Sequence, residues 1–196
     1  MGMMVTEGLV IKILPSPYLH RYRQKKKGNN KPVHEARQVD TKIKTRNELI
    51  PIIEYLHREG KKIALTNGCF DILHVGHIHS FREAKKHSDV LIVALNSDDS
   101  VRSLKGKARP FVPEAQRAEV LAAINYVDYV VIFNELDPLA IITDLKPDVL
   151  VKGEDWAEGT IIGQDVVENR GGKVIRVPLK KGVSTTNLIK KIKTSG

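Results

Sequence analysis

Two patterns of hydrophobic positions alternate along most of the chain. Residues 90–95 form a wholly apolar run, which is typical of a strand buried on both faces. Leu49, Ile53 and Leu56 instead recur at helical spacing, so they predict one buried helix face. Strands alternating with helices in this way indicate a parallel sheet that is covered by helices on both faces.

The alternation predicts an α/β domain built on a doubly wound parallel sheet of about five strands. The expected strands are 62–66, 90–95, 129–133, 149–151 and 173–177. Helices are expected over 45–60, 76–87, 138–145 and 164–170, after Pro113 and after Ser184. The polar stretch 96–112 is predicted to be a loop. In such sheets ligands bind beyond the carboxyl ends of the strands, where the strand order reverses.

Positive charge is concentrated at the beginning of the chain. The whole sequence of 196 residues has a net charge of +9, and residues 1–45 contain ten Lys or Arg against three acidic residues. We therefore predict a basic N-terminal extension over 1–41 and a single domain over 42–196. A basic arm can bind nucleic acid through phosphate contacts. Aromatic residues make up only 5% of the chain, so we favour a solvated leader over a nucleic-acid-binding module.

Composition excludes several other classes of protein. One cysteine cannot form an intramolecular disulfide framework or a cysteine-based zinc knuckle. No apolar run approaches the roughly 20 residues that a membrane helix needs. We expect a cytoplasmic protein without a membrane partner.

The segment TNGCFDILHVGH, residues 66–77, carries the strongest chemical signal. It places His74 and His77 around Gly76, at a turn between a predicted strand and a predicted helix. A helix N-terminus offers unpaired N–H groups and partial positive charge to an anion, and the imidazoles add further donors. A metal site would need a third ligand such as His79 or Asp71, but His79 should face elsewhere on the helix. The segment therefore favours phosphate chemistry over metal binding.

The same segment resembles the signature of the nucleotidyltransferases that are marked by HxGH. Three more segments resemble the adenylyltransferase domain of the ADP-heptose synthases: LIVALNSDDSVRSLKGKARPFVPEAQRAEVLAAINYVDYVVIF, LKPDVLVKGEDW and GVSTTNLIKKI. The resemblance covers residues 42–193. It implies a Rossmann-like domain that transfers AMP from ATP to a sugar 1-phosphate, with heptose 1-phosphate expected, and releases pyrophosphate. Many bacteria fuse this domain to a sugar kinase; here we expect a stand-alone adenylyltransferase.

The resemblance also implies roles for particular residues around the phosphates. His74 and His77 correspond to the histidines that contact the triphosphate and the transferred α-phosphate. A cationic flap over the β- and γ-phosphates would consist of Lys105, Lys107 and Arg109, with Lys105 as its catalytic member. Arg117 matches a phosphate-facing arginine, and its alternative role is a surface ion pair with a carboxylate such as Glu114.

Other segments are expected to border the nucleotide and the acceptor. Gly68, Cys69 and Phe70 shape the first turn, where Cys69 is not expected to act as a nucleophile, and Asp71 is expected to face the acceptor sugar. The residues expected to contact the nucleotide from KGEDW are Lys152, Gly153, Asp155 and Trp156; the tryptophan could instead belong to the core. Ser184, Thr185 and Thr186 open the last helix and would form an anion cradle for the triphosphate.

One departure from the family pattern keeps a second substrate class open. The heptose enzymes typically have glycine where this chain has Glu154. The alternative is a CTP-dependent cytidylyltransferase that acts on glycerol 3-phosphate or a related polyol phosphate. Related cytidylyltransferases carry an Arg-Thr pair where this chain has Leu179 and Lys180, which favours ATP. Mg²⁺ is expected to accompany the nucleotide, held by phosphate oxygens and water rather than by a protein site. Relatives also suggest a homodimer.

Overall fold

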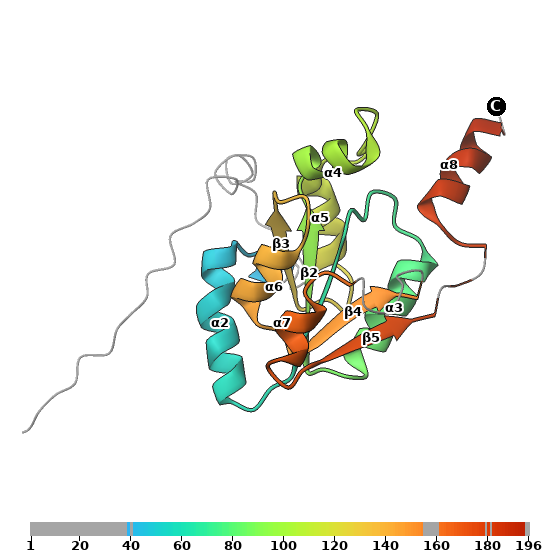
Figure 1. Cartoon of the computed structure of the whole chain (residues 1–196). Helices are drawn as coiled ribbons and strands as arrows, with labels where there is room; N and C mark the ends of the chain where they lie inside the picture. Colours follow the sequence, from blue (N-terminus) through green and yellow to red (C-terminus); the bar gives the residue numbers. More distant parts are fainter. Residues whose placement is uncertain (1–38, 40, 155–160, 179, 181, 195–196) are drawn as a thin grey trace, which may run out of the picture. The chain divides into compact units, whose positions relative to one another are not determined.

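Strands and helices alternate along the part of the chain that the structure describes. The structure is a computed structural model, and it describes residues 39, 41–154, 161–178, 180 and 182–194. The strands are β1 (Ile63–Gly68), β2 (Val90–Asn96), β3 (Tyr129–Phe133), β4 (Val149–Gly153) and β5 (Lys173–Val177) (Figure 1). The helices are α2 (Arg46–Arg58), α3 (Val75–Lys85), α4 (Asp98–Lys105), α5 (Glu114–Ala122), α6 (Leu139–Leu145), α7 (Gln164–Glu168) and α8 (Thr185–Thr194).

The five strands form one parallel sheet in the order β3-β2-β1-β4-β5. The central strand β1 pairs Leu65 with Ile92 of β2 on one side and with Leu150 of β4 on the other. The chain proceeds from β1 to one edge of the sheet and then returns to build the other edge with β4 and β5. The strand order therefore reverses between β1 and β4, and the predicted doubly wound parallel sheet is confirmed.

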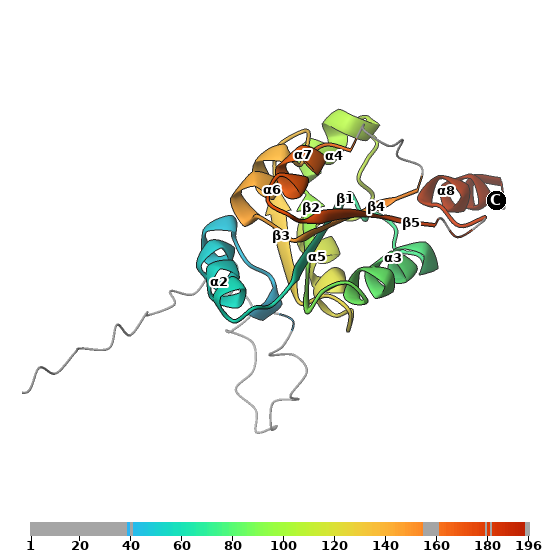
Figure 2. The ribbon, with the colours of Figure 1, turned by 60° about the horizontal axis from the view of Figure 1, so that its bottom comes forward.

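Two apolar clusters cover the two faces of this sheet. One cluster packs Phe81 of α3 and Leu121 of α5 against strand residues such as Val93. The other packs α2, α6 and α7 against the opposite face, where Leu65 and Ile92 point. Figure 2 shows α3 and α5 on one side of the sheet and α6 and α7 on the other. Neighbouring strand residues enter opposite clusters because successive side chains on a strand alternate between faces.

The helix that begins after Thr45 has the predicted capping box. The Glu48 N–H donates to Thr45 Oγ1 at 3.3 Å, and the Thr45 N–H donates to Glu48 Oε2 at 2.8 Å. β1 and β4 each continue two residues beyond their predicted ends. This extension carries Asn67 and Lys152 to the carboxyl edge of the sheet as strand residues.

The prediction of a loop over 96–112 is wrong for its first half, because α4 occupies Asp98–Lys105. Ser97 caps this helix by accepting the Ser100 N–H at 3.2 Å. Acidic residues in the first turn and basic residues in the last complement the helix dipole. These local signals outweigh the low apolar content, since the helix buries only Ser100 and Val101.

The basic extension predicted over 1–41 lies almost wholly outside the described residues. The chain already contacts the sheet at the predicted start of the domain, where the Lys44 N–H donates to the Val130 carbonyl at 2.9 Å. No helix among the described residues is long and apolar enough to cross a membrane.

Candidate active site

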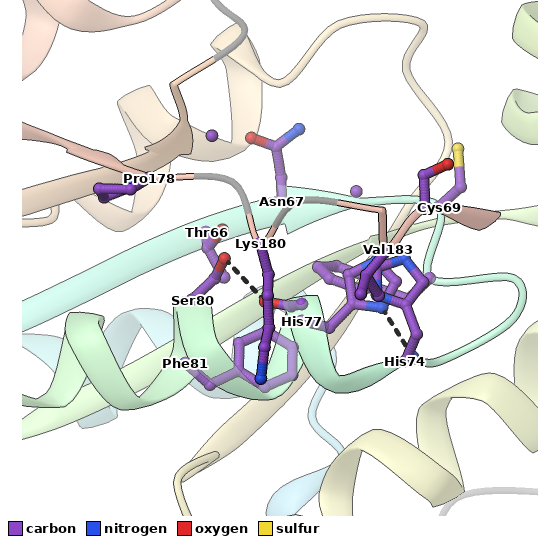
Figure 3. A pocket seen from close by; sticks show the side chains of 15 residues that line it. Thr66, Asn67, Cys69, His74, His77, Ser80, Phe81, Pro178, Lys180 and Val183 are labelled. Atoms are coloured by element: carbon purple, nitrogen blue, oxygen red, sulfur yellow. Dashed lines mark hydrogen bonds between the residues drawn. The ribbon is translucent and has the colours of Figure 1, made fainter. Parts of the chain in front are cut away.

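A hollow of about 300 Å³ opens at the carboxyl end of β1 (Figure 3). Its walls come from the end of β1 and the turn after it, the start of α3, the end of β4 and the segment that leads into α8. The predicted site residues among its lining are Gly68, Cys69, Phe70, His74, His77, Gly153 and Ser184. The hollow lies at the point where the strand order reverses, which is where parallel sheets of this kind bind ligands.

His74 and His77 form a stacked pair at the start of α3. His74 occupies the N-cap position, and His77 lies three residues later in the first turn. Their ring centroids are 3.8 Å apart with 17° between the ring planes. The His74 N–H points to His77 Nδ1 at 3.3 Å. Since Nδ1 accepts there, the neutral His77 ring carries its hydrogen on Nε2 and can donate it to a ligand.

Gly76 allows this stacked arrangement because it has no side chain. A Cβ at residue 76 would lie 2.9 Å from His74 Nδ1 and 3.0 Å from His74 Cε1. Both distances are shorter than ordinary contacts. The glycine between the two histidines therefore makes room for the first imidazole.

Both imidazoles are uncharged at neutral pH in the free protein. Burial, together with the nearby His74, lowers the pKa of His77 to about 4, and burial also lowers the pKa of His74. Within the described residues, His74 Nδ1 is buried without a hydrogen-bond partner. A buried nitrogen left unpaired costs about 1–3 kcal/mol. The site therefore holds uncharged imidazoles, one of which has a buried nitrogen without a partner in the described part of the structure.

Phe70 fixes the second histidine from the side of the first turn. Its ring meets the His77 ring edge-on, with centroids 5.2 Å apart and 67° between the planes. Its backbone has a φ of 44°, an unusual value for a residue other than glycine, at the sharp bend after β1. A Cβ on Gly68 would lie 3.2 Å from the Phe70 ring. The two residues therefore shape the turn together, as expected.

Cys69 lines the hollow as a half-buried thiol. Burial raises its pKa, and the positive charge of Lys105 opposes that shift. The protonated thiol that results is a weak nucleophile.

The predicted cationic flap is attached to the site at one end. Lys105 ends α4, and Lys107 follows it; both are exposed. Arg109 instead donates from Nε to Asp71 Oδ2 at 2.5 Å, and its guanidinium lies over the Phe111 ring at 4.9 Å. The contact of these cations with β- and γ-phosphates stays a prediction.

Asp71 has a different environment from the expected one. Its side chain is only 1% exposed. One oxygen accepts the N–H groups of Phe111 at 2.8 Å and Val112 at 2.9 Å, while the other faces Arg109. The carboxylate therefore ties the first turn to the loop before α5 with both of its oxygens, and its contact with an acceptor sugar stays a prediction.

Arg117 also turns inward. It is 2% exposed, and its guanidinium donates to the carbonyls of Cys69 at 2.6 Å and Asn96 at 2.9 Å. Its ion-pair partner is Asp98 at 2.6 Å, so the alternative of a surface pair with Glu114 is wrong. The arginine bridges the carboxyl ends of β1 and β2, and a contact with phosphate stays a prediction.

The start of α8 contributes hydroxyl groups to the opposite wall. Ser184 Oγ accepts the Asn187 N–H at 3.1 Å, which confirms the predicted helix cap. Thr185 Oγ1 donates to the Ile72 carbonyl at 3.3 Å and so connects α8 with the first turn. Thr186 is exposed. Asp155 and Trp156 lie outside the described residues.

Several residues of the site were not predicted from the sequence. Thr66, Asn67, Ser80 and Lys180 line the hollow. The Lys152 side chain reaches Asn67 Oδ1 at 2.5 Å, and its expected contact with the nucleotide stays a prediction. A basic residue just ahead of the STT segment was the available signal for Lys180. No group of three or more His, Cys, Asp or Glu able to hold a metal ion occurs among the described residues.

A stacked histidine pair at a helix start, placed where the order of a parallel sheet reverses, defines a nucleotidyltransferase type of site. The model of the cytidylyltransferase-like family matches residues 65–193, and the chain belongs to this family. It is therefore an enzyme of the nucleotide-transferring class.

Two curated relatives that match most of this chain are bifunctional proteins. The chain is 54% identical over 153 residues to the bifunctional protein HldE of Geobacter metallireducens, covering 78% of this chain and 31% of that protein. It is 47% identical over 159 residues to bifunctional protein HldE of Syntrophotalea carbinolica, covering 81% of this chain and 32% of that protein. The chain thus spans about a third of the length of these curated relatives.

Solved structures share the fold. The lipopolysaccharide core biosynthesis protein of Thermoplasma volcanium is 31% identical with a TM-score of 0.52, over 63% of this chain and 100% of that one. The pantoate-beta-alanine ligase of Francisella tularensis, solved in complex with beta-gamma ATP and beta-alanine, is 19% identical with a TM-score of 0.54, over 77% of this chain and 76% of that one. At that identity the ligase shows the fold alone.

Proposed function

We propose that the chain transfers AMP from ATP to a sugar 1-phosphate, with heptose 1-phosphate as the expected acceptor. The products are an ADP-sugar and pyrophosphate. The observation that carries the proposal is the stacked pair of neutral histidines beside a hollow at the switch point of the sheet. The extended resemblance to ADP-heptose synthases and the identity with the HldE proteins support the choice of acceptor.

The reaction needs alignment and charge stabilisation more than acid–base chemistry. A phosphate oxygen of the acceptor attacks the α-phosphorus of ATP, a new O–P bond forms, and the bond to the bridging oxygen of the β-phosphate breaks. Pyrophosphate leaves with that electron pair. The attacking oxygen is already ionised, so no general base is required, and positioning supplies much of the rate.

The histidines suit this task because they are donors without being fixed charges. The His77 Nε2–H is held in place by the Nδ1 contact with the His74 N–H. Preorganised donors in a site with little water stabilise charge that develops on a phosphoryl group. Lys180 lines the same hollow, and its cation would stabilise the negative charge of the triphosphate.

We also propose that Mg²⁺ accompanies the nucleotide. It would neutralise part of the triphosphate charge. The described residues contain no carboxylate and histidine cluster that could hold the ion alone. The coordination of Mg²⁺ by phosphate oxygens and water is the usual arrangement where the protein supplies few ligands.

A screen of pyrophosphate release tests the proposal directly. Each of ATP, CTP, GTP and UTP would be combined with heptose 1-phosphate, other sugar 1-phosphates and glycerol 3-phosphate. We expect the highest kcat/KM for ATP with heptose 1-phosphate. Strict use of CTP with glycerol 3-phosphate would replace the proposal by the cytidylyltransferase alternative. No release with any pair would contradict both.

A further inference from the structure

One polar contact joins the two strands between which the order of the sheet reverses. Asn67 lies in β1 and Lys152 lies in β4, in neighbouring parallel strands whose register pairs Thr66 with Val151. Lys152 Nζ donates to Asn67 Oδ1 at 2.5 Å. The contact therefore crosses the switch point at its carboxyl edge, where the hollow begins.

The chemistry of the two groups fixes the direction of the Asn67 amide. An ammonium group only donates hydrogen bonds, so the amide oxygen must face Lys152. Rotating the amide by 180° would place its NH2 group against a buried cation. Lys152 is only 7% exposed, so water would not screen that repulsion. The amide NH2 is thus held away from Lys152.

The residue that carries this amide lines the hollow. Asn67 is half-buried and lines the hollow together with both histidines. In the view of Figure 3 the amide nitrogen lies on the side toward Cys69, and the oxygen lies on the opposite side. The two N–H groups are thus presented by a lining residue at the edge where a ligand is expected.

The cation behind the amide strengthens these donors. Burial lowers the pKa of Lys152 to about 8, so the charged ammonium form still predominates at pH 7. A positive charge on the carbonyl side polarises the amide and makes its N–H groups better donors, and the effect is larger where the dielectric is low. Such donors suit an anionic acceptor such as phosphate.

We propose that Asn67 donates from Nδ2 to a phosphate oxygen of the bound nucleotide, and that Lys152 is a positioning residue that keeps this donor directed into the site. The inference rests on the proposed function, since it names a contact of the same site. The competing view is that Asn67 only gives the buried lysine a partner.

The substitution Asn67→Asp separates the two views because it replaces the amide NH2 group and keeps the oxygen that faces Lys152. Lys152 keeps an oxygen partner, which becomes an ion pair, while the donor NH2 becomes a negatively charged oxygen. We expect kcat/KM for ATP to fall at least 100-fold and the Kd of a non-hydrolysable ATP analogue to rise at least tenfold. The unfolding temperature of the free protein should be unchanged or higher. Asn125→Asp, on an exposed turn between α5 and β3, is the control for the added charge.

Activity and analogue binding equal to the control would overturn the inference. If the unsubstituted protein binds the ATP analogue but transfers no nucleotide to any acceptor, the proposed function fails, while weaker binding by Asn67→Asp still supports the contact. Lys152→Gln provides a second test should Asn67→Asp not fold. We expect it to raise the KM for ATP about fivefold with little change in kcat, and an unchanged KM would count against the positioning role.

Discussion

The two edges of the parallel sheet differ in the polar groups that they carry. At the amino edge, aspartates accept the backbone N–H groups where strands begin. The pairs are Asp128 with Leu91 at 2.7 Å, Asp89 with Lys62 at 2.8 Å and Asp148 with Ile63 at 2.8 Å. These carboxylates are paired within the protein and stabilise the strand starts.

At the carboxyl edge, the histidine pair beside the hollow is not fully paired within the part of the chain that the structure describes. His74 Nδ1 is buried without a partner among the described residues, and the His77 ring presents its Nε2–H. Buried polar groups are normally paired, so each exception needs an explanation. The comparison indicates that stability is concentrated at one edge of the sheet and ligand binding at the other.

The largest expected effect comes from removing one donor of the carboxyl edge. In His77→Asn the new Oδ1 can still accept the His74 N–H, but the Nε2 donor is lost. We expect turnover to fall about 100- to 1,000-fold, as for the loss of one preorganised donor, with a similar fall for His74→Ala. The fall in turnover is measured by steady-state pyrophosphate release. The control is His79→Asn, on the same helix but beside Glu83 and Arg82, which should keep the turnover of the unsubstituted protein. A His77→Asn variant as active as this control would refute the role assigned to His77.

A second effect concerns the pH dependence of stability. The pKa of His77 is about 4 in the folded state against 6.5 ordinarily, so the unfolded chain binds the proton more tightly. Its contribution is present above pH 6.5 and is lost as the pH falls toward 4, up to about 3 kcal/mol. Urea denaturation at pH 7 and pH 4.5 should show a smaller loss for His77→Asn than for the unsubstituted protein. Equal losses would contradict the buried neutral histidine.

The amino edge should respond in stability and not in activity. Asp128→Ala leaves the buried N–H of Leu91 without its acceptor, which should lower the free energy of unfolding by about 1–3 kcal/mol. Asp99→Ala, which removes an exposed pair with Arg102, should cost less than about 1 kcal/mol. Denaturant titration measures the free energies of unfolding of the two variants. A large fall in kcat for Asp128→Ala, at a temperature where this variant remains folded, would contradict the view that the amino edge serves stability and the carboxyl edge serves activity.

The smallest effect tests the space around His74. Gly76→Ala adds a Cβ that would meet the His74 ring at 2.9 Å, so the ring must move by a few tenths of an ångström. We expect kcat to fall about tenfold, because small displacements of a positioned group are costly. Alanine favours helix over glycine by about 0.5–1 kcal/mol, so stability should not explain the loss. An unchanged kcat would show that the stacked geometry is not needed.

The sequence predicted most of the fold because its signals are local and repeated. Apolar runs gave the strands, and the capping residue Thr45 gave the start of α2. The missed helix α4 had a local signal as well, in Ser97 and the acidic residues after it, but its few apolar positions concealed it. The histidine pair was predicted from the spacing in a single segment.

The contacts of other site residues could not be predicted from local patterns, because their hydrogen-bond partners lie far away in the chain. Arg117 was expected to face phosphate, and the structure adds its burial against the carbonyls of Cys69 and Asn96. Asp71 was expected to face a sugar, and the structure adds its contacts with the loop before α5. A charged side chain has the same local sequence pattern whether or not it has such partners, so only the three-dimensional structure shows them.

By itself, the order of the residues determined the alternation of strands and helices, the pair of histidines at a helix start and the family of the protein. Only the tertiary structure decided that Lys152 meets Asn67 across the switch point, 85 positions apart in the chain. The physical reason is range: helix caps and hydrophobic periodicity act between near neighbours, whereas the direction of a buried amide depends on the cation that a distant strand brings beside it.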